Sequence, residues 1–330
     1  MLRCERCPTM SVATPESTAD VVDLITDARL TGLPLWFTGS GTSPVPDGHT
    51  VVSTSKLMGI VDYKPDDLTV VVRCGTTLTE LDAVLSEHGH TAVLPETTGS
   101  RTVGGVVASG ASGYRRLRYG PTRDRVIGAT IVTGYGEIVH AGGQLVKNVT
   151  GYDLPRLMTG SRGALGFISD VSLKLWPIPK GRRTVSVANV ADARVEAYQP
   201  IAALETEAGG FLHISDSSGE DEGFSWPEPM MGEVVRVVNI PPRLVPDTVA
   251  RIKASSATRF VAQHGVGAVE AAWDGIAKQQ LDEFRVWTES CGGSIPEMPQ
   301  VPESIGIQRR LKAMFDPDRI CNPGVLPGGV

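Results

Sequence analysis

Residues 95–176 read PETTGSRTVGGVVASGASGYRRLRYGPTRDRVIGATIVTGYGEIVHAGGQLVKNVTGYDLPRLMTGSRGALGFISDVSLKLW, and the fold of the chain depends on them. The first half is rich in small residues, namely Gly99, Gly104, Gly105, Ser109, Gly110, Ser112 and Gly113. Small residues let a backbone approach a ligand closely, and their N–H groups can face anionic oxygens. The second half contains two runs that predict strands, Val126–Thr133 and Gly166–Trp176. Composition leaves two interpretations open, a site for a phosphate-bearing cofactor or a region of tight turns.

A second cluster of small residues follows Leu33–Phe37, a short apolar run that predicts a strand. The cluster consists of Thr38, Gly39, Ser40, Gly41, Thr42 and Ser43. Phosphates often bind at a glycine loop directly after a strand, although a plain Gly/Ser turn has the same composition. The loop fits neither GxGxxG nor the Walker pattern, so a Rossmann or P-loop site is not indicated.

Several helix signals are clear in the sequence. Thr14–Ala28 has one apolar face and is followed by Gly32, while Thr77 and Glu80 form a capping box that opens a helix. Further short helices are predicted at Val103–Ser109, Asp153–Thr159 and Ser304–Phe315.

Length and composition indicate a soluble protein with two domains, or one large domain with an insert. The chain has 330 residues, of which 41% are hydrophobic and 21% charged, and its net charge is −6. An acidic chain disfavours a role in nucleic-acid binding. No apolar run approaches the length of a membrane span, and the N-terminus lacks the hydrophobic part of a secretory signal. We therefore expect a cytoplasmic protein.

The five cysteines do not form a recognisable framework. They are Cys4, Cys7, Cys74, Cys291 and Cys321, an odd number without regular spacing. Cys4 and Cys7 make one CxxC, but a structural zinc or iron–sulfur site needs four ligands and no second CxxC exists. We predict no metal site.

A basic cluster stands out in this acidic chain, formed by Arg115, Arg116, Arg118, Arg123 and Arg125. It is either a solvated face with ion pairs to residues such as Asp124, or an anion site for a cofactor phosphate or a substrate carboxylate. Both interpretations stay open.

Composition shifts after Pro179. Strands are predicted at Thr184–Val190, Phe211–Ser215, Glu233–Ile240, Arg259–Gln263 and Ala268–Trp273. Helices are predicted at Asp192–Ala203, Pro246–Ala254 and Ile276–Ser290. This order is typical of an antiparallel, ferredoxin-like α+β module.

Two long motifs carry a resemblance to a known family. They are GSGTS followed by TVGGVVASGASGYRRLRYGPTRD, and KNVTGYDLPRLMTGSRGALGFISDVSLKLWPIP. With them the chain resembles the vanillyl-alcohol-oxidase or PCMH-type FAD-binding oxidoreductases, and it is most similar to the smaller FAD-binding subunit of bacterial glycolate oxidases. The ending FDPDRICNPGVL is similar to the usual close of that family. The resemblance is strong over residues 33–179 and 304–326 and weak over residues 180–300.

The resemblance implies an α+β fold in which a PCMH-type FAD-binding domain of two α/β subdomains carries a smaller antiparallel cap domain. We accordingly expect a flexible N-terminus at residues 1–13, the FAD-binding domain at 14–179 and a cap or substrate domain at 180–301. A C-terminal segment at 302–330 would return to the FAD-binding domain.

The resemblance also implies the cofactor site. It assigns the first loop, Gly39, Ser40, Gly41, Thr42 and Ser43, to the FAD pyrophosphate. It assigns Thr102, Gly104, Gly105, Ser109, Ser112 and Gly113 to the pyrophosphate, ribityl chain and flavin ring. Main-chain groups from Gly163 to Ile168 would lie near the adenine or the flavin, and Asn322 would reach the flavin. Some relatives attach FAD through a His in or beside the first loop, and this loop has none. We therefore predict non-covalent FAD.

The reaction that the resemblance implies is oxidation of a small 2-hydroxy acid, of the glycolate or D-lactate type, with hydride transfer to flavin N5. The hydroxyl proton needs a base, and His264 in Gln263–Gly267 is one interpretation, with a structural hairpin histidine as the other. Lys147 and Tyr152 belong to a motif near the flavin, and the alternative is that they only pack their loop.

Three functions stay open at this point. The chain is an FAD subunit of a glycolate-oxidase-like complex, a stand-alone 2-hydroxy-acid dehydrogenase or oxidase, or a flavin-binding structural subunit without turnover. In the first case we expect a second FAD subunit and an iron–sulfur subunit as partners. Those partners would give peripheral association with the inner face of the membrane.

Overall fold

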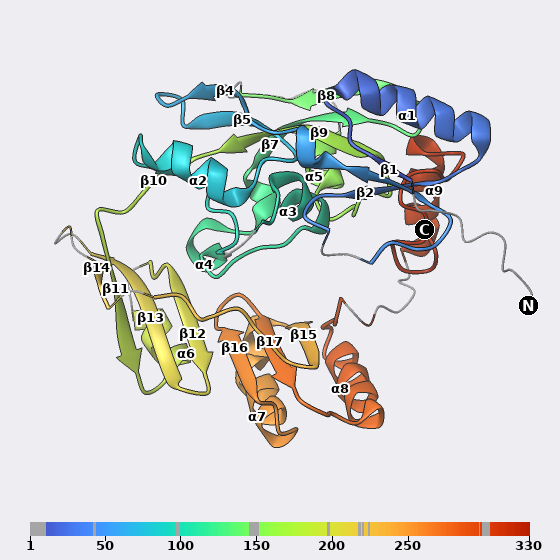
Figure 1. Cartoon of the computed structure of the whole chain (residues 1–330). Coiled ribbons are helices and arrows are strands. Elements are labelled where there is room, and N and C mark those ends of the chain that lie inside the picture. Colours follow the sequence, from blue (N-terminus) through green and yellow to red (C-terminus); the bar gives the residue numbers. More distant parts are fainter. Residues whose placement is uncertain are drawn as a thin grey trace, which may run out of the picture. The chain divides into compact units, whose positions relative to one another are not determined.

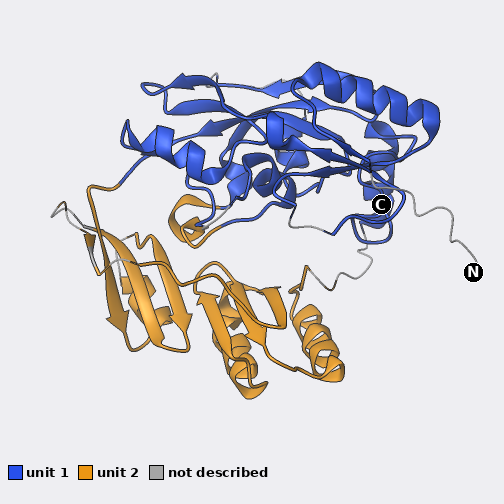
Figure 2. Ribbon diagram, viewed as in Figure 1, with its two compact units in different colours: residues 1–112, 121–178, 301–330 blue, residues 113–120, 179–300 orange. Residues whose placement is uncertain are grey.

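The computed structural model describes residues 11–41, 44–96, 100–144, 152–196, 199–216, 219, 221–223, 225–296, 298 and 304–330 (Figure 1). The chain divides into two compact units, which Figure 2 colours separately. Unit 1 comprises residues 1–112, 121–178 and 301–330, and unit 2 comprises residues 113–120 and 179–300. No helix in the described ranges has the length and apolar character needed to cross a lipid bilayer.

Unit 1 contains a five-stranded antiparallel sheet in the order β4-β5-β9-β7-β8. Its strands are β4 (Ile60–Lys64), β5 (Thr69–Arg73), β7 (Val126–Val132), β8 (Ile138–Gly142) and β9 (Phe167–Lys174). Three helices pack against this sheet (Figure 1) and share one apolar core with it: α2 (Leu78–Ser86), α3 (Val103–Ser109) and α5 (Leu154–Met158). This core holds α3 in place, and α3 carries the first glycines of the long motif.

A smaller parallel sheet completes the N-terminal part of unit 1. It has the order β1-β3-β2, with β1 at Val12–Ala13, β2 at Leu35–Thr38 and β3 at Thr50–Ser53. Helix α1 (Thr18–Thr31) packs on it through Val21 and Ile25. The remaining elements of unit 1 are η1 (Thr54–Lys56), β6 (His90–Thr91), η2 (Thr122–Asp124), β10 (Trp176–Pro177) and α9 (Ile305–Phe315).

Local signals in the sequence predicted most of these elements. The capping box is confirmed, because Thr77 Oγ1 accepts the Glu80 N–H at 3.2 Å and Glu80 Oε2 accepts the Thr77 N–H at 2.9 Å. The predicted helix Val103–Ser109 is also confirmed. Helix α1 begins at Thr18 rather than Thr14, because Ser17 and Asp20 form a capping box of their own.

Unit 2 is built on a seven-stranded sheet in the order β14-β11-β13-β12-β16-β17-β15. Its strands are β11 (Gly181–Val187), β12 (Ala202–Thr206), β13 (Gly209–Asp216), β14 (Asp221–Glu222), β15 (Val234–Asn239), β16 (Arg259–Gln263) and β17 (Ala268–Trp273). Its helices are α4 (Arg116–Tyr119), α6 (Val190–Glu196), η3 (Pro242–Leu244), α7 (Val245–Ala254) and α8 (Lys278–Ser290). All strand pairs are antiparallel except β11–β14, so the predicted antiparallel α+β character is confirmed.

One predicted helix in unit 2 is wrong. The sequence predicts a helix over Asp192–Ala203, but α6 ends at Glu196 and residues 202–206 form the central strand β12. The run Ile201–Leu204 is at most 1% exposed, since β12 pairs with β13 on one side and β16 on the other. Burial on both faces gives a continuous apolar run without strand alternation, and its alanines favour helix in isolation.

The sequence did not indicate that residues 113–120 cluster with unit 2. Tyr114 packs against Ala202, Leu204 and Val261, and Leu117 packs near Val190 and Leu212.

The division into two units also places members of the basic cluster in different units. Arg118 donates to Gln199 O at 2.8 Å in unit 2, whereas Arg123 lies 3.9 Å from Asp124 in unit 1.

Candidate functional site

A cavity of about 300 Å³ lies in unit 1, where segments distant in the sequence meet. Its walls come from the end of β2 and the following loop, from α3 and the residues before it, from a turn at Arg162 and from the C-terminal segment. The lining residues are Trp36, Phe37, Thr38, Gly39, Ser40, Gly41, Arg101, Thr102, Gly105, Val106, Ala108, Ser109, Arg162, Asn322 and Val325. A smaller cavity of about 60 Å³ shares several of these residues and adds Thr54, Cys74, Gly104, Gly163, Gly166, Phe167 and Ile168.

The glycines of the cavity walls allow backbone segments to touch. A Cβ on Gly39 would overlap Thr102 Oγ1, and a Cβ on Gly104 would lie 2.6 Å from Cys74 Cβ and 2.9 Å from Cys74 O. Gly41 has a φ of +74°, and a Cβ there would point into open space. The cavity walls are therefore in close contact at Gly39 and Gly104, whereas open space remains beside Gly41. This arrangement suits a ligand that approaches the backbone closely.

Asn322 joins three of the walls. Its Oδ1 accepts the Phe37 N–H at 2.6 Å, and its Nδ2 donates to Arg162 O at 2.9 Å. The residue is 4% exposed and has a φ of +39°, a left-handed conformation that Asn tolerates better than most residues. Because both ends of the amide bind protein groups, the contacts give Asn322 the role of fixing the cavity walls.

The C-terminal segment around Asn322 is anchored by a buried ion pair. Lys312 Nζ donates at 2.7 Å to Asp316 Oδ2, to Ala164 O and to Cys321 O. Asp316 in turn accepts the N–H groups of Ile320 at 3.0 Å and Cys321 at 2.8 Å. Lys312 and Asp316 are 3% and 0% exposed.

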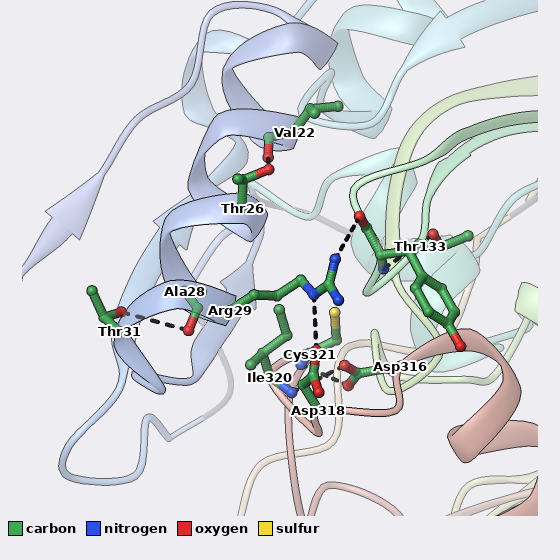
Figure 3. Close-up of polar contacts among 11 residues, drawn as sticks. Val22, Thr26, Ala28, Arg29, Thr31, Thr133, Asp316, Asp318, Ile320 and Cys321 are labelled. Atoms are coloured by element: carbon green, nitrogen blue, oxygen red, sulfur yellow. Dashed lines mark hydrogen bonds and ion pairs between the residues drawn. The ribbon is translucent and has the colours of Figure 1, made fainter.

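Further contacts join this segment to the N-terminal part of unit 1. The Leu35 N–H donates to Ile320 O at 2.7 Å, and the Asn322 N–H donates to Leu35 O at 3.0 Å, so the segment extends the edge of β2. Figure 3 shows Asp316 turned toward Ile320 and Cys321, and Arg29 of α1 bound to Asp318, with Nε and Oδ2 2.8 Å apart. The end of the chain is thus part of the cavity wall.

Two arginines line the larger cavity, and no acidic residue is among its described lining residues. Arg101 precedes α3, and Arg162 lies in the turn that leads to Gly163. Such a wall in a chain of net charge −6 favours an anionic ligand. Sequence reasoning missed both arginines. A charged side chain inside the small-residue run GSRGALG is the signal that could have found Arg162.

The structure brings many of the predicted cofactor residues together. Gly39, Ser40, Gly41, Thr102, Gly105, Ser109 and Asn322 line the larger cavity, and Gly104, Gly163 and Ile168 line the smaller one. Ser112 lines neither, because its Oγ accepts the Thr122 N–H at 3.0 Å, and Gly113 belongs to unit 2. Thr42, Ser43 and Lys147 lie outside the described residues, and Tyr152 is 94% exposed.

Two polar side chains of the smaller cavity have distinct environments. Thr54 is buried, and its Oγ1 has no hydrogen-bond partner among the described residues, so it is available to a ligand. Cys74 is also buried, and burial raises the pKa of its thiol far above the ordinary value. Cys74 therefore stays a neutral packing residue rather than a nucleophile.

His264 lies in unit 2, immediately after β16. It is 5% exposed, and its Nε2 lies 3.0 Å from Glu205 Oε2. Glu205 also accepts Lys253 Nζ at 3.0 Å. The hydrogen bond from His264 is the main cause that lowers the pKa of Glu205, with Lys253 adding to it. A histidine oriented by a carboxylate is suited to accept a proton, and the same pair equally stabilises a hairpin.

His213, on β13, gives unit 2 a predicted pH dependence. It is 2% exposed, and burial lowers its pKa from 6.5 to about 4. Well above pH 6.5 the histidine is neutral both folded and unfolded, so its ionisation does not affect stability. As the pH falls from 6.5 toward 4, only the unfolded chain binds the proton, and we expect a loss of stability that approaches about 3 kcal/mol.

An NMR titration of the His213 ring measures this directly, and we expect a midpoint near 4. Urea unfolding at pH 7 and pH 4.5 should show a smaller loss for His213→Gln than for the unaltered chain. A ring titration near 6.5 would contradict the prediction.

Comparisons with known proteins show which family and which relatives the chain is similar to. Residues 10–142 match the family of FAD binding domains. The glycolate oxidase subunit GlcE of Escherichia coli is 42% identical over 135 residues, which cover 39% of this chain and 39% of that protein. The glycolate oxidase subunit GlcD of Bacillus subtilis is 33% identical over 181 residues, covering 53% of this chain and 38% of that protein. A D-lactate dehydrogenase of Archaeoglobus fulgidus is 30% identical over 170 residues, which cover 50% of this chain and 38% of that protein.

These matches span less than two fifths of the length of the relatives, at 39%, 38% and 38%. Among solved structures, alkyldihydroxyacetonephosphate synthase aligns with a TM-score of 0.70 at 14% identity, covering 94% of this chain and 75% of that one. This likeness concerns the fold alone and agrees with the α+β architecture.

FAD is the cofactor of this domain, and the cavity residues fit it. The glycines allow the diphosphate of FAD to lie close to the backbone, and the arginines match its negative charge. The Thr54 hydroxyl, which has no partner among the described residues, can bind a polar atom of the cofactor.

Proposed function

We propose that this chain, whose residues 10–142 match the family of FAD binding domains, takes part in the FAD-dependent oxidation of a small 2-hydroxy acid of the glycolate or D-lactate type. The observation that carries the proposal is the glycine-walled, arginine-lined cavity of unit 1. The named activities of the relatives, glycolate oxidase subunits and a D-lactate dehydrogenase, support the class of substrate.

The chemistry needs an electron acceptor and a base. When bound, FAD supplies the acceptor, so the α-hydrogen leaves as hydride, the hydroxyl proton goes to a base, and a 2-oxo acid forms. We propose His264 as that base, since its ring is held by the hydrogen-bond contact with Glu205. Lys147 and Tyr152 remain proposed contributors near the flavin.

We further propose that the chain works as the FAD-binding subunit of a glycolate-oxidase-like complex, with a second FAD subunit and an iron–sulfur subunit as partners. The relative with 42% identity, which is itself named a subunit, supports this. The alternative is a stand-alone dehydrogenase, supported by the 30% identical D-lactate dehydrogenase.

An absorption spectrum tests the proposal, taken on the purified chain and on the chain co-purified with its partners. We expect flavin bands after addition of FAD, and anaerobic glycolate or D-lactate should bleach them in at least one preparation. Acetate, which lacks the hydroxyl group, should leave them unchanged. Flavin that stays oxidised with both hydroxy acids in both preparations would contradict the reaction, and a chain that never binds FAD would contradict the cofactor.

We expect His264→Ala to slow flavin reduction by about 100-fold or more, the usual contribution of a general base. His140→Ala is the matched control, since His140 lies on β8 of unit 1 and its ring contacts Thr130 Oγ1 at 3.1 Å. Equal rates in the two variants would remove His264 from the mechanism.

A further inference from the structure

Arg162 combines an unusual backbone conformation with a position at both cavities. Its φ is +53°, in the left-handed region that non-glycine residues rarely adopt. Such conformations cost free energy and persist where the surrounding structure holds them, often at ligand sites. The flanking Gly160 and Gly163 adopt positive φ without this cost, so the turn itself does not need an arginine.

Both backbone polar groups of Arg162 are bound. Its N–H donates to Ala108 O at 2.8 Å, and its carbonyl oxygen accepts Asn322 Nδ2 at 2.9 Å. These two bonds join Arg162 to α3 and to the C-terminal segment, which are two of the cavity walls. The backbone from which the Arg162 side chain extends is therefore held in place at the cavity.

The side chain of Arg162 is exposed, and within the described ranges no carboxylate forms an ion pair with it. Two other arginines of unit 1 do have a carboxylate partner, since Arg29 pairs with Asp318 and Arg156 with Asp124. Gly39 and Gly41 line the same cavity as Arg162, and beside Gly41 there is open space for a ligand. A guanidinium without an ion-pair partner that lines the same cavity as a glycine loop has the charge and the donors for a phosphate group.

We propose that Arg162 binds the diphosphate of FAD and is a main determinant of cofactor affinity. The guanidinium would form charge-assisted hydrogen bonds to the phosphate oxygens, and the glycine loop that lines the same cavity would bind the diphosphate through its backbone N–H groups. The inference rests on FAD as the cofactor and does not depend on the substrate.

The test compares Arg162→Gln with Arg319→Gln by titration of FAD and of riboflavin, which lacks the diphosphate. Arg319 is a matched control, because it is an exposed arginine of unit 1 with a φ of +55° that lines neither cavity. We expect Arg162→Gln to weaken FAD binding by about 10–100-fold, the usual range for a hydrogen bond to a charged group. Riboflavin binding should stay within about 2-fold, and the salt dependence of FAD binding should fall.

Arg162→Gly separates affinity from folding. Glycine adopts the positive φ without strain, so this variant should be at least as stable as the unaltered chain. Its affinity for FAD should nevertheless be reduced, as in Arg162→Gln. Equal losses for FAD and riboflavin, an unchanged salt dependence, or the same loss in Arg319→Gln would each overturn the proposal. An unaltered chain that binds no FAD would instead refute the cofactor.

Discussion

Replacing Lys312 by methionine is expected to destabilise unit 1 by about 3–5 kcal/mol, the usual cost of removing one partner of a buried ion pair. Methionine leaves the Asp316 carboxylate at 0% exposure without its cation. It also removes the donors to Ala164 O and Cys321 O, which hold the Gly163 turn and the C-terminal segment together. Urea unfolding measures the change as a shift of the midpoint at a constant slope.

Two variants calibrate this prediction. Lys56→Met breaks the pair between Lys56 Nζ and Glu16 Oε1, which are 2.5 Å apart on side chains 53% and 69% exposed, and should cost at most about 1 kcal/mol. The double variant Lys312→Met/Asp316→Asn should be more stable than Lys312→Met alone, since no unpaired charge remains buried. A cost for Lys312→Met no larger than that for Lys56→Met would show that the pair does not anchor the segment.

The elements predicted correctly from the sequence depend on signals within a few residues. The Thr77–Glu80 capping box, the helix Val103–Ser109 and the stop at Gly32 are of this kind. Strand β12 was missed because it is held as a strand by its two neighbours in the sheet, β13, which follows it directly in the chain, and β16, which is far away in the sequence. Its alanines carry no local strand signal, and tertiary pairing overrides propensity.

The candidate site shows the same division. The glycine loops could be found, because small residues in series are visible in the sequence and the family resemblance assigns them. Asn322 was found only through the C-terminal motif. The positions of Arg162 and Lys312 could not be derived, because each depends on contacts between residues far apart in the chain, such as Lys312 with Ala164. A lysine in an amphipathic helix gives no sign that it will be 3% exposed.

Replacing Gly163 by alanine is expected to weaken FAD binding by about 100-fold and to destabilise unit 1 by about 2–5 kcal/mol. Gly163 has a φ of +79°, so any Cβ is strained there. The new Cβ would also lie 2.8 Å from Asn322 Nδ2 and 3.2 Å from Phe37 Cδ2. Relief of this overlap moves Asn322 away from Phe37 and Arg162, and the walls of both cavities separate.

Gly160→Ala separates the effect of the steric overlap with Asn322 from the effect of backbone strain. Gly160 has a φ of +89° in the same turn, but a Cβ there would meet nothing within 4 Å. Both variants therefore carry the backbone strain, about 1–3 kcal/mol, and only Gly163→Ala carries the steric overlap with Asn322. FAD titration and urea unfolding of the pair measure the difference. If Gly160→Ala lost as much FAD affinity as Gly163→Ala, strain in the turn would explain both, and the joint at Asn322 would not shape the cavity. If Gly163→Ala alone lost it, the close packing of three chain segments at Asn322 would be what forms the cofactor site.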